Sequence, residues 1–255
     1  MRRLDKSQER AFSLRIAGDP KTACAHYSID FTGASVWRTS DSRCYLVLNP
    51  EPFPEVHIIG TGELSELFEF LRPMPPDTKV LMSKFQYAKL AQTVMARSMR
   101  IIELYTGLAG TTPSGLPPPD PTFDIREVLY SDVPTIQTMP MEAAFLFSGY
   151  KDHRDLVARS AAYGAFNGTQ VGSMATVEMG RSFANMRAFT MPKLRGKGLA
   201  TLCVASILDR LRPTGEQPLF CIRTENGSPE RAMARRFGME RSGELALVER
   251  KFMAL

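Results

Sequence analysis

Residues 185–201 read NMRAFTMPKLRGKGLAT, and the rest of the sequence is interpreted around this stretch. Residues 185–190 are predicted to form a strand, and residues 199–211 an amphipathic helix. The turn between them contains Arg195, Gly196, Lys197 and Gly198. Glycine lets the backbone approach a ligand closely, and the first N–H groups of a helix have no internal partners and lie at the positive end of its dipole. The stretch therefore predicts a phosphate-binding turn, although it is neither a Walker loop nor G-x-G-x-x-G.

The elements around this turn predict a sheet with helices. Asn167-Gly168 separates two strand-like runs, residues 163–166 and 170–178, and is typical of a hairpin. After the helix, residues 219–223 are predicted as a strand, a helix ends at Gly238, and residues 245–250 form the last strand.

In this setting Arg195-x-x-Gly198-x-Ala200 resembles the Q/R-x-x-G-x-G/A signature of the GNAT superfamily of acyl-CoA-dependent N-acyltransferases. The triplet at residues 237–239, Phe-Gly-Met, is similar to the Leu-Gly-Phe helix end of that family. The resemblance covers residues 122–252. It implies an acyl-CoA-binding fold that transfers an acyl group from acetyl-CoA, or another acyl-CoA, to an amine by direct attack.

The resemblance also implies which residues would hold acetyl-CoA as co-substrate. In the family, the strand before the turn splays from its neighbour, and its backbone pairs with pantetheine. Here this implicates Ala188, Phe189 and Thr190. The pyrophosphate contacts carry over to Arg195, Gly196, Lys197, Gly198, Leu199, Ala200 and Thr201. Asn226 resembles a family asparagine that bonds the pantetheine arm, and a loop Asn beside Gly227 is the alternative interpretation.

The sequence departs from the family at the general acid. A tyrosine is frequent four residues before the helix-ending glycine, but Ala234 stands there. The first candidate for a catalytic base is Glu178, at the end of a strand, and Glu225 is the second. A solvated surface carboxylate is the alternative for both. Asp152, beside His153, is interpreted as a helix cap.

The proline-rich stretch at residues 111–121 predicts an extended linker. It separates an N-terminal domain, residues 1–110, from an acyl-CoA-binding domain, residues 122–255. Both halves show the predicted order β, β, β, α, β, α, β, and Leu-Arg-Pro recurs at residues 71–73 and 211–213. The fold class is thus α/β (α+β mixed sheet), with two GNAT-like domains in tandem. The first is degenerate, because its turn, Gly60-Thr61-Gly62-Glu63, carries a carboxylate and no cation.

Composition restricts the function classes. The chain of 255 residues is 44% hydrophobic and 23% charged, as in ordinary globular proteins. No apolar run is long enough to span a membrane, and no signal peptide is indicated, so we expect a cytoplasmic location. Four cysteines without C-x-x-C spacing and three scattered histidines predict buried thiols and no metal site. The basic residues behind the net charge of +5 are dispersed, which disfavours nucleic acid as a partner.

Two other function classes remain open. The missing tyrosine favours a non-catalytic acyl-CoA-binding or regulatory protein, and a nucleic-acid-binding module is a third reading. The amine acceptor, a small molecule or a peptide, is not identified by the sequence, and a homodimer is left open.

Overall fold

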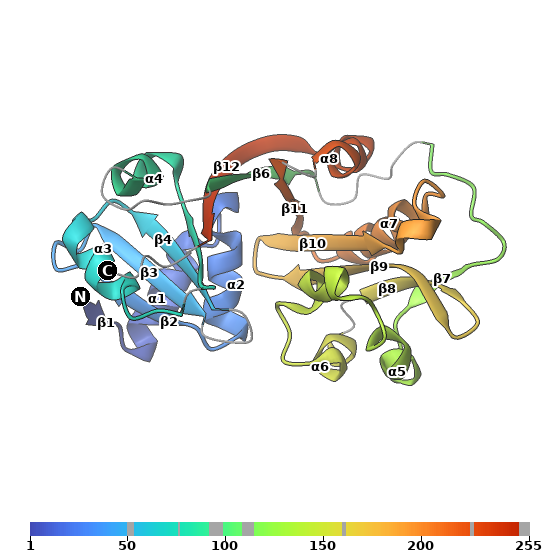
Figure 1. Cartoon of the computed structure of the whole chain (residues 1–255), viewed down its shortest axis with the longest axis horizontal. Helices are drawn as coiled ribbons and strands as arrows, with labels where there is room; N and C mark the ends of the chain where they lie inside the picture. Colours follow the sequence, from blue (N-terminus) through green and yellow to red (C-terminus); the bar gives the residue numbers. More distant parts are fainter. Residues whose placement is uncertain are drawn as a thin grey trace. The chain divides into compact units, whose positions relative to one another are not determined.

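The computed structural model describes residues 1–49, 54–75, 77–91, 99–108, 115–159, 162–224 and 227–249 (Figure 1). Contacts between residues divide the chain into two compact units. Unit 1 comprises Met1–Leu104, Ile222–Gly227 and Ser242–Leu255, and unit 2 comprises Tyr105–Cys221 and Ser228–Arg241. No helix in the described part of the chain is both long and apolar enough to cross a bilayer.

The first half of the chain begins with a short strand and two α-helices, which are followed by three successive strands and then by alternating helices and strands. Its elements are β1 (Arg2–Arg3), α1 (Lys6–Ile16), the 3₁₀ helix η1 (Pro20–Thr22), α2 (Ala23–Phe31), β2 (Ser35–Arg38), β3 (Cys44–Asn49), β4 (Glu55–Gly60), α3 (Leu64–Leu71), β5 (Lys79–Met82), α4 (Lys84–Ala91) and β6 (Met99–Thr106). Helix α1 begins with a capping box, in which the Asp5 carboxylate accepts the Gln8 N–H at 2.9 Å.

The second half repeats this order with longer strands. Its elements are β7 (Asp124–Glu127), η2 (Tyr130–Asp132), α5 (Val133–Ile136), η3 (Met141–Phe147), α6 (His153–Ala158), β8 (Ala162–Asn167), β9 (Gln170–Met179), β10 (Phe183–Thr190), η4 (Pro192–Leu194), α7 (Leu199–Leu211), β11 (Gln217–Arg223), α8 (Gly227–Arg236) and β12 (Glu240–Glu249). Helix α7 has the bounds that the apolar spacing predicts.

The two halves share strand pairing as well as element order. In the first half β2, β3 and β4 pair antiparallel, and β4 then pairs parallel with β5. In the second half β8, β9 and β10 pair antiparallel, and β10 then pairs parallel with β11. The predicted order β, β, β, α, β, α, β is therefore confirmed in both halves, and the strands of each half combine antiparallel with parallel pairing.

The last strand of the chain joins the sheet of unit 1. Residues Ala246, Leu247, Val248 and Glu249 of β12 pair antiparallel with Met82, Leu81, Val80 and Lys79 of β5. The chain passes from unit 2 into unit 1 within β12. The predicted domain ranges follow the chain continuously, whereas the compact units do not, because residues from 242 onward belong with the first half.

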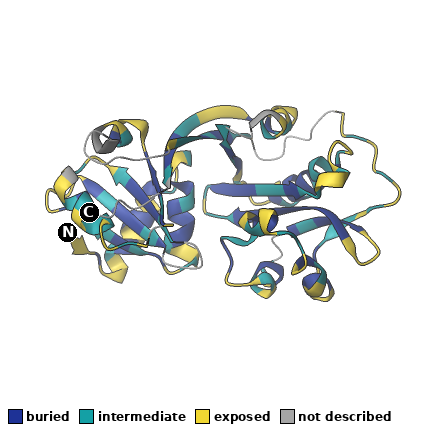
Figure 2. Ribbon diagram, in the orientation of Figure 1, coloured by how far each residue is buried: buried dark blue, intermediate teal, exposed yellow. Residues whose placement is uncertain are grey.

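Each unit has its own apolar core, visible as dark ribbon in Figure 2. In unit 2, α7 packs against β8, β9 and β10. The buried face of α7 is formed by Leu199, Cys203, Val204, Ala205, Ile207, Leu208 and Leu211. In unit 1, one cluster lies around Leu46, Leu67 and Val80, and another around Phe12 and Val36. The predicted burial of thiols holds for Cys44 and Cys203, where burial raises each pKa to about 12, whereas Cys24 and Cys221 are only partly buried.

Some local predictions differ from the structure. Helix α2 and strand β1 have no counterpart in the prediction. In α2, Ala23, Ala25, His26, Tyr27 and Ser28 are all buried, so the segment lacks the polar face that marks an amphipathic helix. A helix was predicted for residues 152–162, but α6 ends at Ala158 and residue 162 already belongs to β8. The cap at its start is confirmed, since the Asp152 carboxylate accepts the N–H groups of Arg154 and Asp155, both at 2.8 Å.

Candidate acyl-CoA site

The turn between β10 and α7 has the backbone conformation that its glycines allow. Gly196 and Gly198 have φ of +81° and +76°, in the left-handed region that residues with a Cβ rarely adopt. Gly198 is the N-cap of α7, and Arg195 follows the short helix η4. The two glycines thus let the chain reverse from β10 into α7 within a few residues.

The start of α7 presents backbone N–H groups without a side-chain cap. Within the described residues no side chain accepts from this N-terminus. The first bond of the helix is donated by the Leu202 N–H to the Gly198 carbonyl, at 3.1 Å. The N–H groups before Leu202 precede the intrahelical pattern and lie at the positive end of the helix dipole. An anion is the group that this arrangement stabilises.

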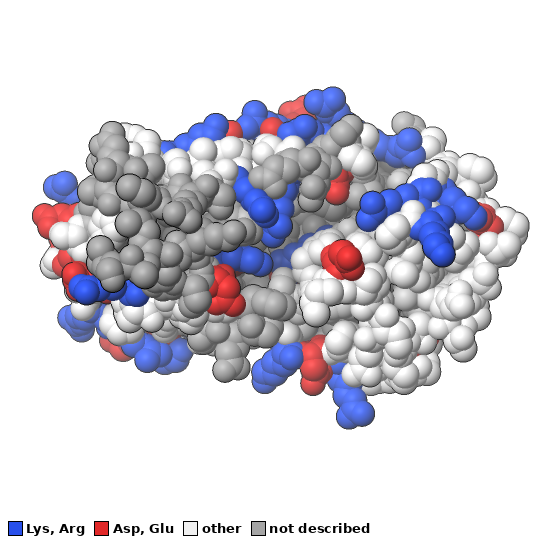
Figure 3. All heavy atoms as spheres, viewed as in Figure 1, with Lys and Arg blue, Asp and Glu red and all other residues white. Residues whose placement is uncertain are grey.

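Two cations flank these N–H groups. Arg195 is exposed, and its Nε donates to the Thr190 carbonyl at 3.4 Å, which holds its side chain near the end of β10. Lys197 is 47% exposed, and its Nζ lies 3.3 Å from Oδ2 of Asp120. Leu199 is buried, so only its backbone is available to a ligand. On the face drawn in Figure 3, Lys and Arg lie in several separate groups with acidic and neutral side chains between them.

Strand β10 leaves its parallel neighbour before it reaches the turn. Its ladder with β11 runs from Phe183–Gln217 to Met186–Phe220. Its ladder with β9 continues to Thr190–Ser173. Ala188, Phe189 and Thr190 therefore lie beyond the end of the parallel ladder, and only Met191 and η4 separate them from the glycine turn. A backbone edge in this position can hydrogen-bond an extended, amide-containing ligand as an added strand would.

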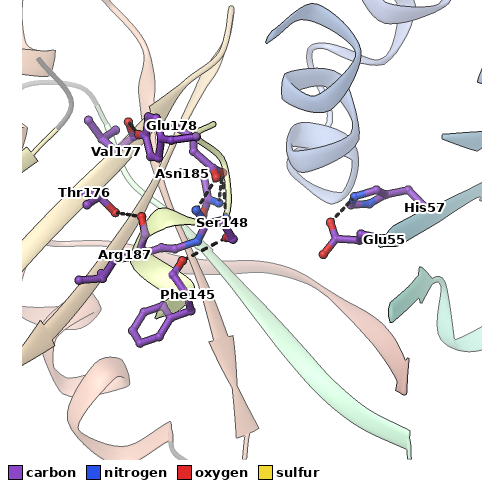
Figure 4. A network of polar contacts seen from close by, with 11 residues as sticks. Glu55, His57, Phe145, Ser148, Thr176, Val177, Glu178, Asn185 and Arg187 are labelled. Atoms are coloured by element: carbon purple, nitrogen blue, oxygen red, sulfur yellow. Dashed lines mark hydrogen bonds and ion pairs between the residues drawn. The ribbon is translucent and has the colours of Figure 1, made fainter. Parts of the chain in front are cut away.

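Glu178 lies on β9 in a buried ion pair (Figure 4). Its carboxylate accepts two N–H groups of Arg187, one of them at 3.0 Å, and the Asn185 side-chain amide at 2.9 Å. The Glu178 side chain is 4% exposed, so the alternative of a solvated strand-end carboxylate is wrong. A Cβ added at Gly149 would lie 1.9 Å from Oε1 of Glu178, so only glycine lets the backbone approach the carboxylate this closely.

The segment η3 covers the same face of the sheet. Arg187 lies directly opposite Thr176 in the β9–β10 register, and Asn185 lies opposite Glu178. The Thr176 hydroxyl donates to the Leu146 carbonyl of η3 at 3.1 Å. The Phe145 ring of η3 meets the Phe189 ring edge to face, with centroids 6.4 Å apart. The ion pair and the predicted pantetheine strand thus share the face of the sheet that η3 contacts.

The position at which the family frequently has a tyrosine is occupied here by a buried alanine, Ala234. Ala234 of α8 is fully buried, so a bulky residue would have no room there. After Phe237, Gly238 adopts φ of +67°, and the Met239 N–H donates to the Ala234 carbonyl at 3.0 Å. This is a helix end of the Schellman type, which explains the Phe-Gly-Met triplet.

The corresponding turn of the first half is closed by packing. Gly60 has φ of +96°, and a Cβ added there would lie 2.2 Å from the Arg43 carbonyl oxygen. A Cβ added at Gly62 would lie 2.7 Å from the Cβ of Cys44. The Thr61 N–H donates to the Arg43 carbonyl at 3.2 Å. These glycines allow close packing against β3. The turn at residues 60–63 contains no Lys or Arg, and its last residue, Glu63, directly precedes α3.

Most of the predicted cofactor-binding residues come together along the end of β10 and the start of α7. Glu178 lies on the neighbouring strand β9. Asn226 and Glu225 lie outside the described residues. The residues that the sequence reasoning missed are Asn185 and Arg187, because their relation to Glu178 depends on the register of two strands. Among the described residues, no group of three or more His, Cys, Asp or Glu is placed to hold a metal ion.

No protein-family model matches the sequence, and no curated protein is similar enough to count as a match. Solved structures do match over nearly the whole chain. A GCN5-related N-acetyltransferase-like protein from Streptococcus suis is 16% identical, with a TM-score of 0.71, covering 96% of this chain and 99% of its own. A Drosophila protein is 12% identical, with a TM-score of 0.70, covering 98% and 99%.

A third similar structure is a tandem GNAT protein from the clavulanic acid biosynthesis pathway. It is 15% identical, with a TM-score of 0.50, and covers 87% of this chain and 85% of its own. At these identities the comparisons concern the fold alone. Taken with the splayed β10 and the glycine turn at α7, they show that the chain has the GNAT fold.

Proposed function

We propose that this protein binds acetyl-CoA, or another acyl-CoA, and transfers the acyl group to an amine. The observation that carries the proposal is that the β10–β11 ladder ends at Met186–Phe220, and that the free edge of β10 leads through η4 and the glycine turn to a start of α7 that no described side chain caps. A backbone edge for an amide-rich arm and a cluster of N–H groups for a diphosphate lie in succession along the chain. The amide-rich arm and the diphosphate of an acyl-CoA molecule would therefore each have hydrogen-bonding groups to contact.

The donors at the turn suit a pyrophosphate. The backbone N–H groups at residues 196–201 supply uncharged donors, and Arg195 and Lys197 supply positive charge beside them. Along β10, the backbone of Ala188, Phe189 and Thr190 is proposed to hold the pantetheine arm. Asn226 is proposed as a further contact to that arm.

When bound, the acyl-CoA supplies an activated thioester. The nitrogen of the amine forms the new bond to the acyl carbon, the bond between that carbon and sulfur breaks, and the thiolate takes up a proton. The chain contributes chiefly by holding the two reactants together, and a β10 N–H would polarise the thioester carbonyl. Since Ala234 offers no acid, the proton for the thiolate must come from another group or from water.

Glu178 is proposed as the group that accepts the proton from the ammonium, directly or through a water. Its position, on the strand beside β10 and on the face that η3 contacts, supports this role. Its three hydrogen bonds from Arg187 and Asn185 support a second role, in which it fixes the Arg187 side chain. The two roles differ in their effect on the pH–rate profile.

Calorimetry and thermal melting with CoA test the binding step. We expect CoA at one hundred times its Kd to stabilise the protein by about 2.7 kcal/mol and to raise the Tm. Absence of binding at millimolar CoA would overturn the proposal.

Release of free thiol from acetyl-CoA in the presence of a panel of amines tests the catalytic step. Amine-dependent release identifies an enzyme and its acceptor class. Binding of CoA without release for any amine favours the second candidate, a non-catalytic acyl-CoA-binding protein, which the buried Ala234 supports.

A further inference from the structure

The described end of the proline-rich stretch lies against the glycine turn. We call residues 115–123 the strap. A Cβ added at Gly198 would lie 2.4 Å from Cγ and 2.8 Å from Cβ of Pro117. The Pro117 ring therefore packs against the N-cap of α7, and Gly198 is needed for this contact as well as for its left-handed backbone.

Asp120 is held in position by its own turn. Its Oδ1 accepts the Thr122 N–H at 3.0 Å and the Thr122 hydroxyl at 2.6 Å, and its carbonyl accepts the Phe123 N–H at 3.0 Å. Phe123 in turn packs on β9, where a Cβ added at Gly172 would lie 2.6 Å from Cε1 of the ring. These contacts anchor the strap beside the turn.

The second oxygen of Asp120 is directed to the turn. Its Oδ2 lies 3.3 Å from Nζ of Lys197, which also lies 6.0 Å from the centre of the Phe123 ring. The hydrogen bonds from Thr122, with the Lys197 charge, hold the pKa of Asp120 below its ordinary value, so the carboxylate is charged at neutral pH. One of the two cations of the turn thus already has an anion beside it.

We propose that Asp120 lowers the affinity of the acyl-CoA site, because it is an internal anion that competes with the pyrophosphate for Lys197. This inference rests on the proposed function. A phosphate oxygen that approaches Lys197 must either displace Asp120 or accept its negative charge nearby, and both cost binding free energy. With Asp120 24% and Lys197 47% exposed, water screens this competition, so the effect on affinity is a modest one.

Titration calorimetry with CoA on the full chain tests the inference through a double-mutant cycle. The proteins are the wild type, Asp120→Asn, Lys197→Ala and the double variant. Asparagine keeps the Oδ1 acceptor for Thr122, so the local turn is retained. We expect Asp120→Asn to tighten CoA binding by about two- to five-fold at low salt, less at high salt, and to have a clearly smaller effect once Lys197 is alanine, where only the direct repulsion between Asp120 and the pyrophosphate is removed.

The matched control is Asp124→Asn, which removes the same charge from β7, where Asp124 is 71% exposed and pairs with Arg126 at 3.3 Å. We expect the control to leave CoA affinity unchanged. Equal gains in the two aspartate variants would mean that net charge alone acts. Unchanged or weaker binding by Asp120→Asn, or an equal effect in both Lys197 backgrounds, would overturn the inference. Wild-type protein that binds no CoA would overturn the proposed function itself.

Discussion

Arg187 on β10 donates two hydrogen bonds to the carboxylate of Glu178 on β9, across two strands that pair in antiparallel register. The pair is buried on the Glu178 side, since the glutamate side chain is 4% exposed and that of Arg187 is 21% exposed. Because the Glu178 carboxylate is buried, the stability of the fold depends on the positive charge of Arg187 beside it.

We therefore expect Arg187→Met to destabilise the fold by about 3–5 kcal/mol, because it leaves the Glu178 charge buried without its ion partner. Urea unfolding measures the change. The matched control is Arg210→Met, whose pair with Glu127 is about one-third exposed on both sides and whose loss should cost under about 1 kcal/mol. Similar losses in the two variants would contradict a special role for the buried pair.

The catalytic role of Glu178 gives a separate prediction. If Glu178 accepts the ammonium proton, Glu178→Gln should lower kcat by about 10²-fold or more and remove the acidic limb of the pH–rate profile. Glutamine preserves the size of the side chain and one acceptor for Arg187. A retained acidic limb with only a loss of stability would leave Glu178 as the partner of Arg187.

Gly196 offers a way to obstruct the turn without disturbing its packing. A Cβ added there meets no atom within 4 Å, and asparagine tolerates left-handed φ better than most residues. We expect Gly196→Asn to change the free energy of unfolding by no more than about 1 kcal/mol and to weaken CoA binding by at least about tenfold. Gly168→Asn, at another open, left-handed glycine in the β8–β9 hairpin, should leave CoA binding unchanged. Calorimetry on both variants decides the matter.

A substitution in the turn at residues 60–63 of the first half should have the opposite effect, lowering stability without changing CoA binding. Gly62→Ala places a Cβ 2.7 Å from the Cβ of Cys44 and 3.0 Å from Cγ2 of Thr39. We expect a loss of about 1–3 kcal/mol in stability from this overpacking and no change in the Kd for CoA. Gly18→Ala, where no atom lies within 4 Å, is the stability control. A weaker affinity for CoA in Gly62→Ala would show that the first half takes part in binding.

Acid should weaken unit 2 partly through Asp132. Two guanidinium N–H groups of Arg126, at 2.7 and 2.8 Å, hold the pKa of this carboxyl below its usual 3.8 in the folded state. The pair stabilises the fold above the unfolded pKa, and this stability is lost as the pH falls through the lower folded pKa. In Asp132→Asn we expect a flatter dependence of unfolding free energy on pH below about pH 4, measured by urea titration. An unchanged slope would show that other carboxylates dominate.

Local signals were sufficient for the elements around the turn. The apolar spacing along residues 199–211 and the Asn167-Gly168 pair each act within a few residues, and α7 and the β8–β9 hairpin match their predictions. Contacts between residues far apart in the sequence could not be predicted from such local signals. The pairing of Arg187 with Glu178 depends on strand register, and the contact of Pro117 with Gly198 joins residues about eighty positions apart.

The pairing of β12 with β5 has a consequence for biosynthesis. Strand β5 ends at Met82, but its partner in unit 1 begins only after residue 240 has been made. A ribosome adds residues from the N-terminus at about 5–20 per second, so the edge of β5 waits for roughly ten seconds or more without β12. An open strand edge invites pairing with other chains. A shortened chain that stops after the first half would lack β12 and would keep the β5 edge exposed. We expect such a chain to aggregate more readily than the full-length protein.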